Sequence, residues 1–113
     1  MATPYVKILK ENSPLRFNCV LWARKKVPSL PYGLWTFEDK KKIETNARPR
    51  VGDIAVVRTN QTWGHVAVVT YVGKMHITIQ EANFYFGKVT ERHNTAQLLR
   101  IHGYFHPKAL DKK

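Results

Sequence analysis

Short apolar stretches separated by brief polar turns fill the chain from Pro49 onwards, and this spacing constrains the fold more than any other feature. Several stretches alternate between apolar and polar residues, as half-buried strands do. Strands joined by two to five residues can pair only antiparallel, because a parallel connection needs about a dozen residues or more. The expected strands are 54–57, 65–72, 75–80, 88–92 and 98–105. The second half therefore predicts an antiparallel meander of about five strands.

A helix is expected in the first half, from Asn18 or Cys19 to Lys26. Asn18 is a good N-cap type, because its side-chain oxygen can accept a backbone N–H that has no partner within the helix. Val27-Pro28 should end the helix, since proline cannot donate to a continuing one.

A second, shorter helix is expected over residues 34–43, with Thr36 and Asp39 as a weak variant of the capping box. Residues 1–13 predict a short lead-in with about one turn of helix. N-terminal helices packed on an antiparallel sheet define an α+β fold.

The 113 residues are expected to form a single domain, 1–113, because neither a linker nor an internal repeat divides them. No uninterrupted apolar stretch is long enough to cross a membrane. Residues 1–7 lack the apolar core of a secretory signal. We therefore expect a monomer with neither a transmembrane segment nor a signal peptide.

The chain is strongly basic, with 19 Lys and Arg against 8 Asp and Glu and a net charge of +11. Such a surface attracts polyanions, whether nucleic acid, an anionic membrane or an acidic cell-wall polymer. The charges are spread along the chain, with small clusters at Arg24-Lys25-Lys26, Lys40-Lys41-Lys42 and Lys112-Lys113. A solvated surface and a dedicated docking face are both open interpretations of this pattern.

Cys19 is the only cysteine, so an internal disulfide is excluded. It lies at the expected start of a helix, where the exposed N–H groups favour the thiolate and lower the pKa of a thiol. Its own backbone N–H could help to hold an oxyanion. The alternative is that Cys19 serves as a small buried apolar residue.

His65 opens an expected strand, and Glu81 and Asn83 close the next one. If that strand continues so far, the side chains of Glu81 and Asn83 point to the same side. A carboxylate or amide beside an imidazole fixes its tautomer and orientation. Each residue alone could be an ordinary polar strand end. Together with Cys19 they predict a nucleophile, a base and an orienting group.

A metal site is not expected. The chain has no paired-cysteine spacing and no helical His-Glu-x-x-His motif, so zinc would need scattered ligands.

Five segments occur in a characteristic order: Asn18-Cys19-Val20-Leu21-Trp22, Pro49-Arg50-Val51-Gly52-Asp53-Ile54-Ala55-Val56, Gly64-His65-Val66-Ala67-Val68-Val69, Glu81-Ala82-Asn83 and Gly103-Tyr104-Phe105-His106-Pro107. This ordered set, spanning residues 17–107, resembles the CHAP domain (cysteine, histidine-dependent amidohydrolase/peptidase). That family has a papain-like fold and is found in bacterial and phage cell-wall hydrolases.

The resemblance implies that Cys19 attacks a peptide or amide carbonyl and that His65 acts as base and then as acid. It implies that Glu81 orients His65, and that Asn83 assists this orientation or the oxyanion. Some members bind calcium upstream of the cysteine. Here Lys10-Glu11-Asn12-Ser13 offers one carboxylate, too few hard oxygen ligands, so we expect neither a metal nor another cofactor.

The implied function is hydrolysis of peptidoglycan amide bonds through a thioester, as an amidase or an endopeptidase. Trp63 and Tyr85 could wall a cleft for a sugar or peptide, or could equally fill the core. Acidic wall polymer could be a further partner, and nucleic acid is not expected. The expected place of action is the bacterial cell wall, reached by a phage lysis system, within a virion or by another secretion path. The alternatives are a papain-like amidase on a soluble peptide conjugate and a non-catalytic, basic nucleic-acid-binding module.

Overall fold

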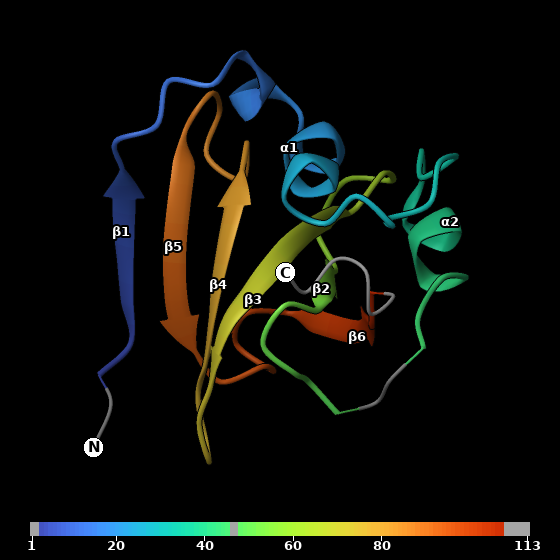
Figure 1. Ribbon diagram of the computed structural model, residues 1–113. Coiled ribbons are helices and arrows are strands. Elements are labelled where there is room, and N and C mark those ends of the chain that lie inside the picture. The colour runs from blue at the N-terminus through green and yellow to red at the C-terminus, as the bar shows by residue number, and fades with distance from the viewer. Residues whose placement is uncertain (1–2, 46–47, 108–113) are drawn as a thin grey trace.

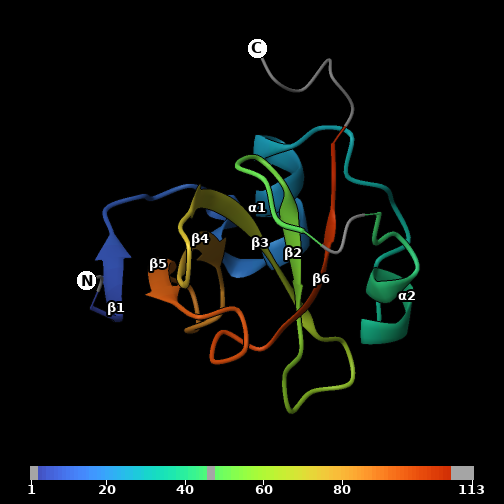
Figure 2. The same cartoon turned by 90° about the horizontal axis from the view of Figure 1, so that it is seen from below.

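The computed structural model describes residues 3–45 and 48–107, and one antiparallel sheet organises them (Figures 1 and 2). The elements, in chain order, are β1 (Tyr5–Leu9), the 3₁₀ turn η1 (Pro14–Phe17), α1 (Cys19–Lys26), α2 (Phe37–Lys41), β2 (Ile54–Val57), β3 (His65–Val72), β4 (Ile77–Ala82), β5 (Val89–Asn94) and β6 (Ile101–Phe105).

The six strands lie in the order β1-β5-β4-β3-β2-β6, and every neighbouring pair is antiparallel. Strands β2 to β5 form the expected meander, β6 adds beside β2, and β1 adds beside β5. Helix α1 packs on β3 and β4, while α2 stands apart beyond the β6 end of the sheet (Figure 1). The predicted α+β class is confirmed, with one strand more than expected.

The additional strand is β1, so the expectation of a helical turn in the lead-in was wrong. Tyr5–Leu9 pairs along its whole length with β5, about eighty residues away in the chain. Its first four residues are exposed, and the segment therefore shows no alternation of buried and exposed positions. The strand exists because β5 offers it an unpaired edge, which no local pattern reveals. Residues 1 and 2 of the lead-in lie outside the described residues.

Both expected helices are present. Asn18 caps α1 as predicted, with its Oδ1 accepting the backbone N–H groups of Val20 and Leu21 at 3.0 Å each. Helix α2 is shorter than the expected 34–43 and begins after a complete capping box between Thr36 and Asp39. Leu34 is buried in the core but lies before this helix.

Strands 54–57 and 65–72 have the predicted bounds. The third strand runs over 77–82 instead of 75–80, because a hairpin closed by the Gly73 N–H to the His76 carbonyl occupies the preceding residues. The last strand begins at Ile101 instead of 98, since residues 95–100 form turns that end at Arg100 with a φ of 62°.

Two apolar clusters fix the sheet. One lies under α1 and joins Trp22, Ala23, Val27, Leu30, Leu34, Ile54, Val66, Ala82, Val89 and Phe105. The other joins Ala55, Val57, Ala67, Val69, Ile77, Ile79, Leu99 and Tyr104. Consecutive residues of β3 enter opposite clusters, as the two-residue repeat of a strand requires. The first cluster holds the N-terminus of α1 against the sheet. No helix in the described part of the chain is long and apolar enough to cross a membrane.

Candidate active site

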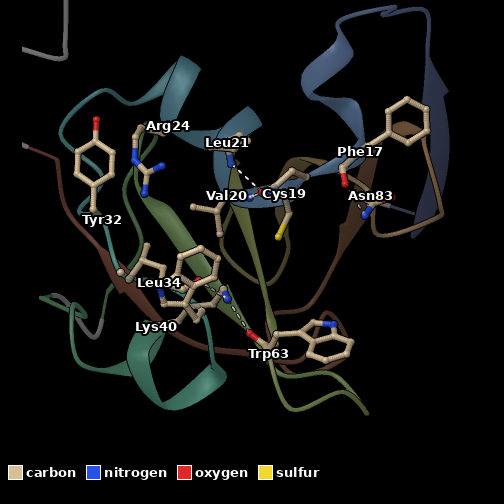
Figure 3. Close-up of a pocket in the computed structure, with 14 residues that line it drawn as sticks. Phe17, Cys19, Val20, Leu21, Arg24, Tyr32, Leu34, Lys40, Trp63 and Asn83 are labelled. Atoms are coloured by element: carbon tan, nitrogen blue, oxygen red, sulfur yellow. Dashed lines mark hydrogen bonds between the residues drawn. The ribbon is translucent and has the colours of Figure 1, made fainter.

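A pocket of about 540 Å³ opens at the N-terminus of α1 (Figure 3). Its walls come from the start of α1, the loop before α2, one side chain of α2, the loop before β3 and the turn after β4. The lining residues are Phe17, Asn18, Cys19, Val20, Leu21, Arg24, Tyr32, Gly33, Leu34, Trp35, Lys40, Trp63, Gly64 and Asn83.

Cys19 is the first residue of α1, and its side chain extends from the helix into this pocket (Figure 3). The thiol is free and partly buried. Its place follows from two contacts of the preceding residues: Asn18 caps the helix, and the Phe17 carbonyl accepts the Asn83 side-chain N–H at 3.0 Å. A local cap and a long-range contact from Asn83 therefore fix the thiol at the helix start together.

His65 and Glu81 form a buried pair, with His65 Nε2 3.0 Å from Glu81 Oε1. The pair forms because β3 and β4 are antiparallel, so the start of one strand meets the end of the other. An imidazole has two ring nitrogens. With Nε2 bonded to the carboxylate, Nδ1 remains for the Cys19 thiol. The hydrogen bond between Cys19 and His65 shifts the pKa of both groups.

Burial opposes ionisation of the Cys19 thiol and is the largest influence on its pKa. The hydrogen bond and charge of His65, the Val66 N–H and the Lys40 charge outweigh it, and together lower the Cys19 pKa from its ordinary 9.0. Burial also opposes protonation of His65, but hydrogen bonds and charge from Cys19 and Glu81 raise the His65 pKa from 6.5 to about 9. These shifts favour a thiolate–imidazolium pair over a neutral thiol and imidazole.

The Glu81 carboxylate is completely buried and accepts hydrogen bonds from two further residues. Arg92 donates to it through Nε at 2.7 Å and Nη2 at 2.9 Å, and the Thr90 hydroxyl donates at 3.2 Å. The Arg92 guanidinium lies 3.6 Å over the Phe84 ring, which in turn packs on His65. Burial raises the Glu81 pKa, but the hydrogen bonds and charges of His65 and Arg92 lower it on balance.

Sequence reasoning missed both Thr90 and Arg92. A usable signal existed, because they are two residues apart on a predicted strand and so share one face. Their register opposite β4 was the missing information.

Asn83 lies in the pocket wall, but not on the strand. Strand β4 ends at Ala82, and Asn83 takes a φ of 64°, so the expectation that it extends beside Glu81 along one strand was wrong. Asparagine tolerates this left-handed conformation better than most residues. Its side chain bonds the Phe17 carbonyl and accepts the Gly87 N–H at 2.8 Å. Within the described residues no hydrogen bond joins it to His65.

Of the two expected cleft aromatics, the structure brings one to the pocket. Trp63 lines it and is 58% exposed. Tyr85 is 47% exposed, packs edge-on against Phe84 and does not line the pocket. Neither side chain fills the core. Two aromatics that were not predicted, Tyr32 and Trp35, line the pocket as well, and both are strongly exposed.

Lys40 also lines the pocket, although the sequence placed it in a surface cluster of three lysines. It is only 2% exposed, and its Nζ donates to the carbonyls of Leu34 at 3.0 Å and Trp63 at 2.7 Å (Figure 3). Burial lowers the Lys40 pKa, partly offset by the negative charges of Cys19 and Asp39. No group of three potential metal-ligating side chains occurs in residues 3–45 and 48–107.

The site thus combines a thiol at a helix start with an imidazole–carboxylate pair on adjacent strands, within an α+β fold. A family model described as the CHAP domain matches residues 9–83, and the chain belongs to the CHAP domain family. The resemblance noted from the sequence motifs is thereby confirmed.

A solved structure agrees in fold. The chain is similar to the crystal structure of Ly7917, with a TM-score of 0.55 and 16% identity over 90% of this chain and 56% of that chain. The crystal structure of Ly7917 with the hydrolyzing product of MDP aligns at a TM-score of 0.47 and 24% identity, over 55% of this chain and 29% of that one. The chain thus spans about half, or less, of the length of these chains. No curated protein sequence matches it.

Proposed function

We propose that this protein is a cysteine hydrolase that cleaves amide bonds of peptidoglycan through a thioester intermediate. The observation that carries the proposal is the connected chain of Cys19, His65 and Glu81 at the head of a pocket. Membership of the CHAP family supports the same chemistry. A buried pair of this kind has no use in a surface that merely binds nucleic acid, so the hydrolase is favoured over a basic binding module.

In the first step, the Cys19 thiolate attacks the carbonyl carbon of the substrate amide. The oxyanion is held at the start of α1 by the backbone N–H of Cys19. The next two backbone N–H groups, of Val20 and Leu21, already donate to the Asn18 side chain. The His65 imidazolium donates its proton to the amide nitrogen, the C–N bond breaks, and the amine leaves. The product is a thioester on Cys19.

In the second step, water attacks the thioester carbonyl while neutral His65 accepts one of its protons. The C–S bond breaks, and the carboxylic product leaves the thiolate and imidazolium restored. Glu81 keeps the ring in place and stabilises its protonated form. Asn83 acts through the Phe17 carbonyl, holding the turn that positions Cys19.

The pocket supports a substrate with sugar and peptide parts, because Trp35 and Trp63 offer exposed rings beside the thiol. We propose that the protein acts at the bacterial cell wall, delivered by a phage lysis system or within a virion.

The test is incubation of purified protein with peptidoglycan, with and without iodoacetamide, and in parallel with Cys19→Ala. We expect release of new amino groups by the parent protein and loss of at least about a thousandfold in rate without the thiol. Lys25→Ala, on the exposed side of α1, serves as the matched control and should keep the parent rate. Equal cleavage by Cys19→Ala would contradict the proposal.

Mass spectrometry of the released fragments distinguishes the two finer activities. New termini between the sugar and the stem peptide indicate an amidase, and new termini within the peptide indicate an endopeptidase. Cleavage of a soluble peptide conjugate but not of peptidoglycan would favour the papain-like alternative.

A further inference from the structure

Lys40 is a buried cation that the proposed chemistry does not use. It projects from α2 to the pocket wall opposite α1, with its Nζ between the loops that carry Trp35 and Trp63 (Figure 3). Both of its acceptors, the Leu34 and Trp63 carbonyls, are uncharged. Within the described residues no carboxylate forms an ion pair with Lys40. An ammonium group has three N–H donors, so one remains for a ligand.

The nearby negative charges compensate the Lys40 ammonium only in part. The Cys19 thiolate pairs with the His65 imidazolium, and Glu81 pairs with Arg92. The negative charges of Cys19 and Asp39 offset the burial of the Lys40 ammonium only in part, and a further negative group beside it would reduce the cost of burying this charge.

The charged residues that line the pocket are few. No described lining residue carries a carboxylate, and the only other lining cation is Arg24. The Arg24 guanidinium already donates to the carbonyls of Leu30 and Pro31 and lies over the Tyr32 ring. Arg24 keeps further N–H donors, but it is only partly buried, whereas Lys40 is buried and has one donor left at the wall opposite α1. A single ammonium among exposed aromatic rings suits one carboxylate rather than a run of phosphates, which needs several cations.

We propose that Lys40 is a specificity-determining residue that binds a free carboxylate of the substrate close to the scissile amide. The favoured substrate class is peptidoglycan stem peptides with an unamidated carboxyl group next to the cleaved bond. The inference deepens the proposed function and rests on it. A competing role for Lys40 is purely structural, since it also ties together the two loops that carry the tryptophans.

Three synthetic stem peptides separate these roles. One is fully amidated, one has a free glutamyl α-carboxylate, and one has a free C-terminal carboxylate. Cleavage by the parent protein gives kcat/KM for each peptide. Binding of the same peptides to Cys19→Ala, measured by calorimetry, reports recognition independently of the chemistry.

We expect one of the free carboxylates to be preferred over the amide by about tenfold to a hundredfold, as a hydrogen bond to a charged group provides. In Lys40→Met this preference should fall to about twofold or less, in both binding and kcat/KM. The preference is the ratio of the values for the carboxylate and amide peptides, measured with the same variant. A smaller folded fraction of that variant therefore lowers both values equally and leaves the ratio unchanged. Lys42→Met is the matched control: it removes the same charge from an exposed position two residues away and should keep the full preference.

The possible failures are distinguishable. If the parent shows no carboxylate preference, or if Lys40→Met keeps it, the inference is overturned even where hydrolysis stands. If Lys40→Met lowers binding and cleavage of all three peptides equally, Lys40 is only a structural tie and the inference is likewise overturned. If Cys19→Ala binds the carboxylate peptide selectively but the parent cleaves neither these peptides nor peptidoglycan, the carboxylate site stands and the proposed hydrolysis fails.

Discussion

We expect the reactivity of Cys19 to depend on sharing a proton with His65. The Cys19 pKa is lowered from 9.0, and the His65 pKa is raised to about 9. As pH rises, activity should increase when Cys19 loses its proton and decrease near pH 9 when His65 loses the proton required by the leaving amine. The kcat/KM profile should therefore be bell-shaped, with its upper limb near pH 9.

Replacing His65 by Ala should return the Cys19 thiol toward its ordinary pKa. Alkylation by iodoacetamide at about pH 7 should then slow at least about tenfold, because the thiolate fraction decreases. His76→Ala, in the β3–β4 hairpin, is the control and should alkylate at the parent rate. An unchanged alkylation rate in His65→Ala would show that the two groups are not coupled.

Arg92 acts on the site through Glu81. Arg92→Met should cost about 3 kcal/mol in the free energy of unfolding at pH 7, because it leaves a buried carboxylate short of partners. The Glu81 pKa is lowered from 4.5, so these interactions stabilise the fold above about pH 4.5 and are lost as pH falls through the lower folded value. The penalty should therefore shrink in acid.

Urea unfolding of Arg92→Met at several pH values measures this effect. Arg48→Met, at an exposed position, is the matched control and should change stability by no more than about 0.5 kcal/mol. A penalty for Arg92→Met that is small and independent of pH would show that Glu81 does not need the guanidinium.

At the scale of elements, we expect the start of α1 to couple stability to the proposed catalysis. Asn18→Ala should destabilise the protein by about 1 kcal/mol, since it frees two backbone donors, and should also lower kcat by misplacing Cys19. Thermal unfolding and peptidoglycan cleavage measure the two effects. Asn60→Ala, in an exposed loop, should leave both unchanged. A loss of stability without any change in kcat would separate the cap from the site.

The elements also show where local patterns are sufficient. Helix α1 and strands β2 and β3 were predicted with the observed bounds or within one residue, because cap, proline and alternation act over a few neighbouring residues. Strand β1 could not be predicted in this way, since its stability comes from pairing with β5. The same holds for Arg92, whose role depends on the register between β4 and β5.

At the scale of the whole molecule, the net charge of +11 predicts an electrostatic contribution to wall binding. Binding to cell walls rich in acidic polymer should fall steeply between about 0.05 and 0.5 M salt, as screening shortens the range of the attraction. Sedimentation of the protein with walls measures it, and walls stripped of acidic polymer are the control. Binding that does not respond to salt would argue against this contribution.

Several decisive features of this protein follow from the sequence alone. Cys19 at a capped helix start, His65 at a strand start, the α+β class and the family are all encoded in short ordered segments, because capping and strand alternation are local. The tertiary structure decided what those residues do together. It placed Glu81 between His65 and Arg92, turned Asn83 toward Phe17, and buried Lys40 at the pocket wall instead of leaving it in a solvated cluster. These outcomes depend on strand register and loop packing, in which the partners lie far apart along the chain.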